Sequence, residues 1–219
     1  MLPFTHEQFL AVFASYNEAI WPFQVVAYLL GAAAVGLLFR PGVWSRRVIA
    51  GSLAAMWLWT GIAYHWLSFA PINPAATVFA AFFVVEGLLL LYYGVARDGL
   101  DFGYDGGGAA ILGLAFVVYA AVLYPLIGLW AGAVYPAMPV FGVTPCPVTI
   151  FTFGLLLLTR APVSRWLLLI PFLWSLIGGS AAFVLGVPQD WMLLLSGLVA
   201  VPVILMRDRH VSGASGHFA

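Results

Sequence analysis

Residues 106–159 read GGGAAILGLAFVVYAAVLYPLIGLWAGAVYPAMPVFGVTPCPVTIFTFGLLLLT, and none of these side chains carries a charge. A bilayer crossing needs only about 20 predominantly apolar residues, so this run is long enough for more than one crossing. Over the whole chain 64% of the residues are hydrophobic and 7% are charged, whereas an ordinary soluble domain has roughly 25% charged residues. The composition excludes a soluble fold and indicates a multi-pass integral membrane protein.

The composition also excludes several kinds of chemistry. All eight basic residues are arginines, so the chain has no lysine amine for a retinal or pyridoxal Schiff base. Cys146 is the single cysteine, which rules out an intramolecular disulfide and a multi-thiolate metal site. Eight acidic residues balance the arginines, so no net charge attracts nucleic acid. The sequence identifies no cofactor.

Apolar runs between charges, prolines and glycines predict an all-α bundle of seven transmembrane helices. These runs are residues 21–39, 48–67, 74–96, 109–130, 145–159, 166–186 and 189–206. The arginines decide whether the short fifth run crosses, because seven crossings place all of them on one side and six crossings divide them equally. Since positively charged loops face the cytoplasm, we expect seven spans with the N-terminus outside and the C-terminus inside. Six spans and a re-entrant segment are the alternative.

The two ends of the chain lie outside the predicted transmembrane domain, residues 21–206. Residues 1–20 carry aromatic side chains at helical spacing and predict an amphipathic helix at the membrane interface. Thr5 and Gln8 have the spacing of a capping box at the start of this helix. Residues 207–219 are polar and contain glycine and serine, which is typical of a disordered tail. We expect that tail in the cytoplasm.

Two predicted cytoplasmic loops have similar sequences. Residues 40–46 read RPGVWSR and residues 160–166 read RAPVSRW. Further matches follow in the same order at a drifting offset, so the first three and the last three spans are candidates for parallel repeats joined by the fourth span, as in some transporters. Arginine is expected in every inner loop of such a protein, and coincidence is therefore the alternative.

The sequence TPCP at residues 144–147 predicts the start of the fifth helix, because proline is favourable in a first helical turn and unfavourable further along. From there to Arg160 a helix rises only about 20 Å, which is less than the roughly 30 Å of the hydrocarbon core. The helix should therefore begin inside the membrane, where irregular backbone must be buried or line a wet cavity. Three hydroxyl side chains belong to this region: Thr144, Thr149 and Thr152.

A few ionisable residues remain inside or at the edge of the predicted spans. Glu86 lies about 16 Å from the cytoplasmic edge marked by Arg97, near the midplane. A carboxyl group there is costly and marks a candidate functional site, with a structural hydrogen bond as the alternative. His65, Glu18 and Cys146 are all expected on the outer side, and such a nitrogen, oxygen and sulfur set would suit Zn or Cu(I). Structural roles for the histidine, in an aromatic belt, and for the cysteine, as a small buried residue, are the alternatives.

Short motifs are spread over nearly the whole chain. They include LPFT at 2–5, YNE at 16–18, YH at 64–65, INPA at 72–75, EG at 86–87, TPCP at 144–147 and FTFG at 151–154. Together they resemble a bacterial multi-pass inner-membrane family known only as a domain of unknown function. The resemblance implies a location in the bacterial inner membrane and supplies no activity, substrate or cofactor.

These observations favour a transporter or channel for a small solute or metal ion, with its site at the broken start of the fifth helix. Cys146 and His65 are the predicted ligands, and Glu86 is the predicted coupling carboxyl group. The rest of the predicted pathway is Tyr64, Asn73, Thr144, Thr149, Thr152 and Glu18. The alternatives are a non-catalytic assembly or binding component, and a membrane-embedded enzyme with Cys146 as nucleophile and His65 as base. The expected partners are the bilayer and the solute, and the oligomeric state stays open.

Overall fold

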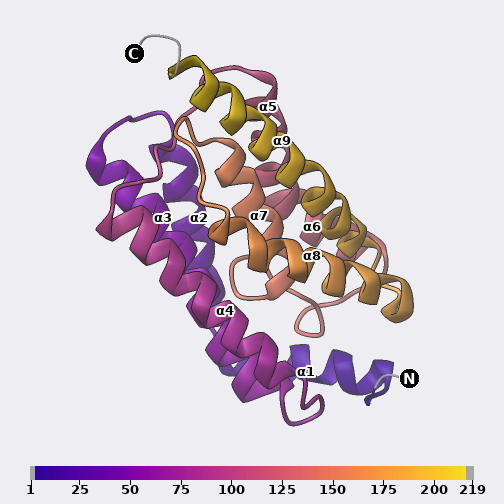
Figure 1. Ribbon diagram of the computed structural model, residues 1–219. Helices are drawn as coiled ribbons and strands as arrows, with labels where there is room; N and C mark the ends of the chain where they lie inside the picture. Colours follow the sequence, from indigo (N-terminus) through magenta and orange to yellow (C-terminus); the bar gives the residue numbers. More distant parts are fainter. Residues whose placement is uncertain (1–2, 216–219) are drawn as a thin grey trace.

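The computed structural model describes residues 3–215, which fold into helices and connecting loops (Figure 1). Helical elements follow in the order α1 (His6–Ala19), α2 (Phe23–Leu37), α3 (Val43–Trp59), η1 (Thr60–Phe69), α4 (Ala76–Leu90), η2 (Leu91–Ala96), α5 (Gly108–Val118), η3 (Tyr119–Leu123), α6 (Tyr124–Trp130), α7 (Pro145–Leu157), α8 (Trp166–Leu185), η4 (Pro188–Asp190) and α9 (Trp191–Ser215). The segments η1, η2 and η3 are π-helical and continue the helices before them, and η4 is a short 3₁₀ helix. Each of the seven predicted runs coincides with a helix.

Within the described residues, four helices are long and apolar enough to cross a membrane. They cover Ala76–Ala96, Gly108–Trp130, Trp166–Leu185 and Pro188–Arg209, and a fifth is added if α1 and α2, which meet at a bend of 84°, form one broken span. The chain is therefore compatible with a membrane protein, but the count is below the seven predicted spans. One reason is that α7 has only 13 residues. In addition, α2 has 15 residues and α3–η1 is not among the helices that are apolar enough.

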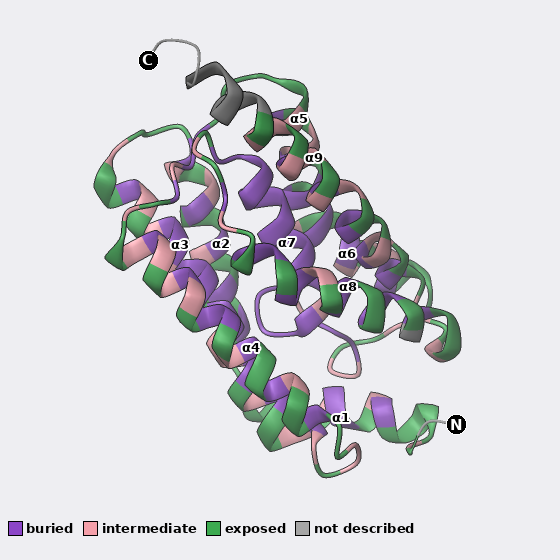
Figure 2. Ribbon diagram, viewed as in Figure 1, coloured by how far each residue is buried: buried purple, intermediate pink, exposed green. Residues whose placement is uncertain are grey.

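The short helix α7 lies at the centre of the bundle (Figure 2). It packs against α3, α5, α8 and α9, and Cys146 is the one residue of this helix that is not fully buried. Backbones approach closely where Gly113 of α5 faces Gly154 of α7, since a Cβ atom added to Gly154 would lie 2.8 Å from the carbonyl oxygen of Gly113. Longer helices thus enclose a helix that is too short to cross a membrane alone. Such burial is what irregular backbone at membrane depth would need.

Charged side chains tie the loops together at one end of the bundle. Asp101 accepts from Arg160 at 2.8 Å and lies 3.2 Å from Nε of Arg46, and Arg47 forms an ion pair with Asp98. The hydrogen bond from Arg47 holds the pKa of Asp98 below its usual value. Arg46 and Arg47 at the beginning of α3 and Arg160 after α7 thus meet the acidic loop after η2 at this end.

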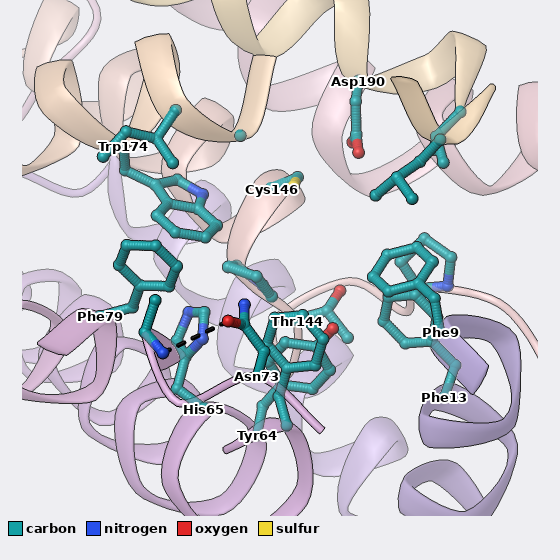
Figure 3. A pocket seen from close by; sticks show the side chains of 18 of the residues that line it. Phe9, Phe13, Tyr64, His65, Asn73, Phe79, Thr144, Cys146, Trp174 and Asp190 are labelled. Atoms are coloured by element: carbon teal, nitrogen blue, oxygen red, sulfur yellow. Dashed lines mark hydrogen bonds between the residues drawn. The ribbon is translucent and has the colours of Figure 1, made fainter. Parts of the chain in front are cut away.

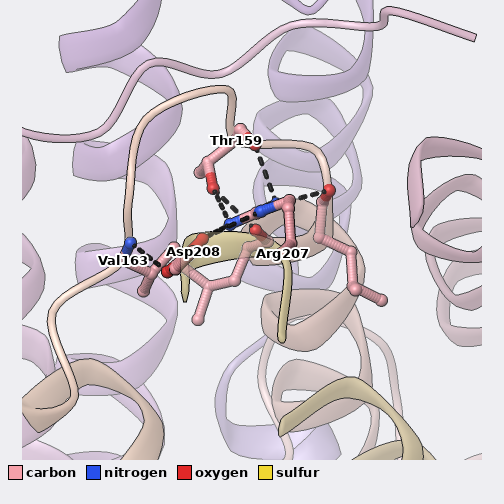
Figure 4. A network of polar contacts seen from close by, with 6 residues as sticks. Thr159, Val163, Arg207 and Asp208 are labelled. Atoms are coloured by element: carbon pink, nitrogen blue, oxygen red, sulfur yellow. Dashed lines mark hydrogen bonds and ion pairs between the residues drawn. The ribbon is translucent and has the colours of Figure 1, made fainter. Parts of the chain in front are cut away.

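The beginning of the predicted tail belongs to the fold (Figure 4). The Arg207 guanidinium donates to the carbonyl oxygens of Leu157 and Thr159, and Asp208 accepts from the backbone N–H of Val163. An arginine is favourable at the carbonyl end of a helix, here α7. Helix α9 continues to Ser215, so the segment from residue 207 begins as part of that helix, and residues 216–219 of the predicted disordered tail lie outside the described part of the chain.

At the other end of the bundle α1 lies across the helices (Figure 1). The capping box of Thr5 and Gln8 is present, as predicted. Helix α1 buries its aromatic face against η1, and its Tyr16 hydroxyl donates to the carbonyl oxygen of Val143 at 2.7 Å. Asn17 donates to two carbonyl oxygens of the loop before α7. The amphipathic helix therefore covers the bundle from the side where α7 begins.

The proposed repeats pack differently from each other. In the C-terminal triplet α7 contacts both α8 and α9, whereas in the N-terminal triplet α2 packs mainly against α3. The packing of the described helices therefore adds no support for a duplication beyond the similarity of the two loops.

Candidate functional site

A cavity of about 490 Å³ lies at the end of the bundle opposite the ion pairs. Its walls come from α1, the second half of η1, the beginnings of α4, α6 and α7, the middle and end of α8, and η4 (Figure 3). Because α3 and η1 form one continuous helix, its arginines and its cavity residues lie at opposite ends. Most of the lining side chains are aromatic or aliphatic, which is typical of a small-molecule site with a few polar groups.

The π-helical segment η1 carries His65 into the cavity wall. The side chain is 0% exposed, and neither ring nitrogen has a hydrogen-bond partner among the described residues. Its ring packs edge-on against Phe83 and Trp174, with centroids 4.7 and 5.0 Å away. A buried polar side chain without a partner is costly and calls for an explanation, and π-helical turns are frequent at functional sites. A ligand in the cavity would supply the missing partner.

Asp190 is a functional candidate that the sequence reading missed. It belongs to η4, lines the cavity, and is 8% exposed. Its carboxylate accepts a hydrogen bond from the Tyr124 hydroxyl and lies beside the Cys146 thiol. The sequence does contain a signal for this residue, because Asp190 is the one acidic residue in the predicted seventh span, residues 189–206. The sequence pattern alone places it at the beginning of a span, next to a turn.

Five residues of the predicted site meet at this cavity. Its lining includes Tyr64, His65, Asn73, Thr144 and Cys146, which come from η1, the loop before α4 and the start of α7. Figure 3 shows His65 and Tyr64 facing Cys146 and Asp190 across the opening. The structure thus brings together the histidine, the cysteine and the broken start of α7, which sequence alone could not demonstrate.

The other four predicted residues, Thr149, Thr152, Glu18 and Glu86, lie outside the cavity lining. Thr149 and Thr152 are buried within α7, where each hydroxyl donates to the carbonyl oxygen four residues earlier. Thr152 also accepts from the indole N–H of Trp57 at 2.8 Å, which joins α7 to α3. Glu18 is exposed on α1. The two threonines therefore serve helix packing, and Glu18 is not part of the cavity wall.

Glu86 is buried on α4, outside the cavity. Its side chain is 0% exposed, and neither carboxyl oxygen has a partner among the residues that the structure describes. It lies one helical turn from Phe83, whose ring contacts both His65 and Trp174. The structural alternative, a hydrogen bond to a tyrosine or tryptophan, is therefore not observed in the described part of the chain.

The surroundings of Cys146 and His65 bear on the metal and nucleophile hypotheses. Among the side chains that the structure describes, no three His, Cys, Asp or Glu residues form a group that could hold a metal ion. His65 makes no hydrogen bond to Cys146 or to any other described residue, so a cysteine–histidine pair is not formed. Reactive cysteines lie beside cationic groups, whereas Cys146 lies beside a carboxylate.

The described chain is all-helical, has helices apolar enough to cross a membrane, and encloses a cavity with mostly apolar walls. The chain belongs to the family of unknown function DUF6064, whose model matches residues 6–215. This match confirms the resemblance to a domain of unknown function. No curated protein and no solved structure matches the chain.

Proposed function

We propose that this protein is a multi-pass transporter of the bacterial inner membrane, and that the cavity at the start of α7 binds its small solute. The observation that carries this proposal is His65, a buried side chain in the cavity wall with two ring nitrogens that lack partners in the described chain. A bound solute with a hydrogen-bonding group would satisfy them. The location in a bacterial membrane follows from the resemblance of the sequence motifs.

In this proposal seven helical segments cross the bilayer. Besides the four long apolar helices, they are α2, the continuous helix α3–η1 and the enclosed α7. Residues 43–69 form a helix about 40 Å long, which is sufficient for a crossing. The arginine-rich end then faces the cytoplasm under the positive-inside rule. The cavity opens toward the outside.

The broken helix supports transport over a purely structural role. Discontinuous membrane helices that begin at a solute site recur in secondary transporters, and α7 begins at Pro145 in the cavity wall. Among the described side chains, no three His, Cys, Asp or Glu residues lie close enough to hold a metal ion, and we therefore favour an organic solute. Glu86 would couple solute movement to a proton, because a carboxyl group at such depth is costly and marks a functional role.

The test is solute flux in proteoliposomes. Three radiolabelled aromatic probes of similar size serve as solutes: cationic benzyltrimethylammonium, anionic benzenesulfonate and neutral phenylpropanediol. We expect at least one of them to cross about tenfold faster than in protein-free liposomes. Equal rates for all three probes with and without protein would overturn the proposal.

Glu86→Gln then tests the coupling role. The amide has nearly the same shape and no ionisable proton, so we expect the folded fraction to be kept and the flux of the transported probe to fall about tenfold. Glu7→Gln, at an exposed position of α1, is the matched control and should leave flux unchanged. Unchanged flux in Glu86→Gln would show that Glu86 has no role in transport.

A further inference from the structure

The charges of the cavity wall select among solutes. Among the described residues no arginine lines the cavity, and Asp190 is its one acidic lining residue. The arginines with described ion pairs lie at the other end of the bundle. An anionic solute would therefore meet the Asp190 carboxylate without an arginine or lysine to balance its charge, at a large desolvation cost.

The start of α7 adds to this selectivity. Helix N-termini usually bind anions through free backbone N–H groups. Here Pro145 and Pro147 have no N–H to donate, and the N–H of Val148 is already bonded to the carbonyl oxygen of Thr144. Of these first-turn positions in the described chain, only Cys146 keeps a free backbone N–H. This helix end is poorly suited to an anion.

The aromatic walls suit a cation with an apolar surface. Phe13 stacks on Tyr64 with centroids 5.4 Å apart, and Phe9 packs edge-on against Phe13 at 4.9 Å. Phe79 and Trp174 form the opposite wall, at 5.3 Å from each other (Figure 3). Aromatic rings attract ammonium groups, and rings around a pocket are how proteins bind quaternary ammonium ions.

We infer that the solute is an organic ammonium ion, with its charged group at Asp190 and its apolar part against the aromatic walls. This inference rests on the proposed function, since it assigns the chemical class of the same solute. The Tyr124 hydroxyl, which donates to the Asp190 carboxylate, fixes the orientation of that carboxylate. The unpartnered nitrogens of His65 then receive the hydrogen-bonding groups of the solute.

The natural single cysteine provides the test. Cys146 lies beside Asp190 in the cavity, so the rate at which it reacts with charged methanethiosulfonates reports the local preference for charge. The reagents are the trimethylammonium-ethyl and the sulfonato-ethyl compounds, each rate being divided by the rate with a free thiol in the same detergent. We expect the cationic reagent to be preferred by about tenfold or more, and this preference to disappear in Asp190→Asn.

Asp105→Asn is the control for the loss of one acidic charge. Asp105 is exposed in the loop before α5, and its side chain accepts a hydrogen bond that asparagine can also accept. This variant should keep the wild-type preference. Equal normalised rates in the wild type, or a preference that survives in Asp190→Asn, would overturn the inference.

A second measurement uses the wild type only, and it tests cation binding in the cavity even if Asp190→Asn does not fold. Uncharged methyl methanethiosulfonate labels Cys146 in the wild type in the presence of benzyltrimethylammonium or benzenesulfonate. Protection by the cation alone supports the inference, and equal protection or none overturns it. Flux of any probe in the proteoliposomes would still support the proposed function, so the two failures can be told apart.

Discussion

Replacing Gly154 by alanine will lower the free energy of unfolding by about 2 kcal/mol. A Cβ atom at this position would lie 2.8 Å from the carbonyl oxygen of Gly113 and 2.9 Å from the backbone nitrogen of Val117. Both are backbone atoms of α5, and α7 cannot retreat because helices surround it. The measurement is unfolding by sodium dodecyl sulfate titration, followed by circular dichroism.

Gly51→Ala is the matched control. Gly51 lies within α3, and a Cβ atom there would meet no described atom within 4 Å. Alanine is the better helix former by roughly 0.5–1 kcal/mol, so this variant should be stabilised. Opposite signs at the two positions support the central placement of α7. Stabilisation of Gly154→Ala to the same degree would contradict the close contact between α5 and α7.

The second large effect concerns His65→Phe, which should make the protein more stable and its solute flux lower. Phenylalanine keeps a flat ring within the aromatic cluster and removes two buried nitrogen atoms that lack partners in the described chain. Because an unsatisfied buried polar group costs about 1–3 kcal/mol, we expect a gain of about 1 kcal/mol. Solute flux in proteoliposomes should fall about tenfold at the same time.

Thr60→Val separates the two effects. The Thr60 hydroxyl is also buried without a partner in the described chain, but it lies outside the cavity lining. This variant should gain stability and keep its flux. If His65→Phe instead destabilises the protein and leaves flux unchanged, His65 is a structural residue and the site has been assigned wrongly.

The local parts of the fold could be predicted from sequence. Prolines fix the start of α7 through their own geometry, and the capping box of Thr5 and Gln8 depends on neighbouring residues. Tertiary contacts determine other features, such as where α9 ends. The helix extends beyond Arg207 because that side chain is held at the end of α7, and no local pattern predicts such a contact.

The candidate site could be predicted only in part, because the residue types are visible in the sequence but their contacts are not. His65 and Cys146 were identified by their chemistry, but their meeting depends on how η1 packs near the start of α7. Asp190 was missed because a carboxylate next to a turn is usually solvated, and here α6 and α7 bury it. Gly113 and Gly154 were not singled out either, since close helix approach depends on which faces meet.

The most direct test of the central claim is the side from which Cys146 can be reached. Sealed right-side-out vesicles are treated with the membrane-impermeant trimethylammonium-ethyl methanethiosulfonate, and labelling is read by mass spectrometry. Ser164→Cys in a Cys146→Ala background places a thiol at the arginine-rich end as the control. The account predicts that Cys146 is labelled in intact vesicles and that the control thiol at position 164 is labelled after permeabilisation only. Labelling of Cys146 only after permeabilisation or denaturation would contradict an outward-facing solute cavity.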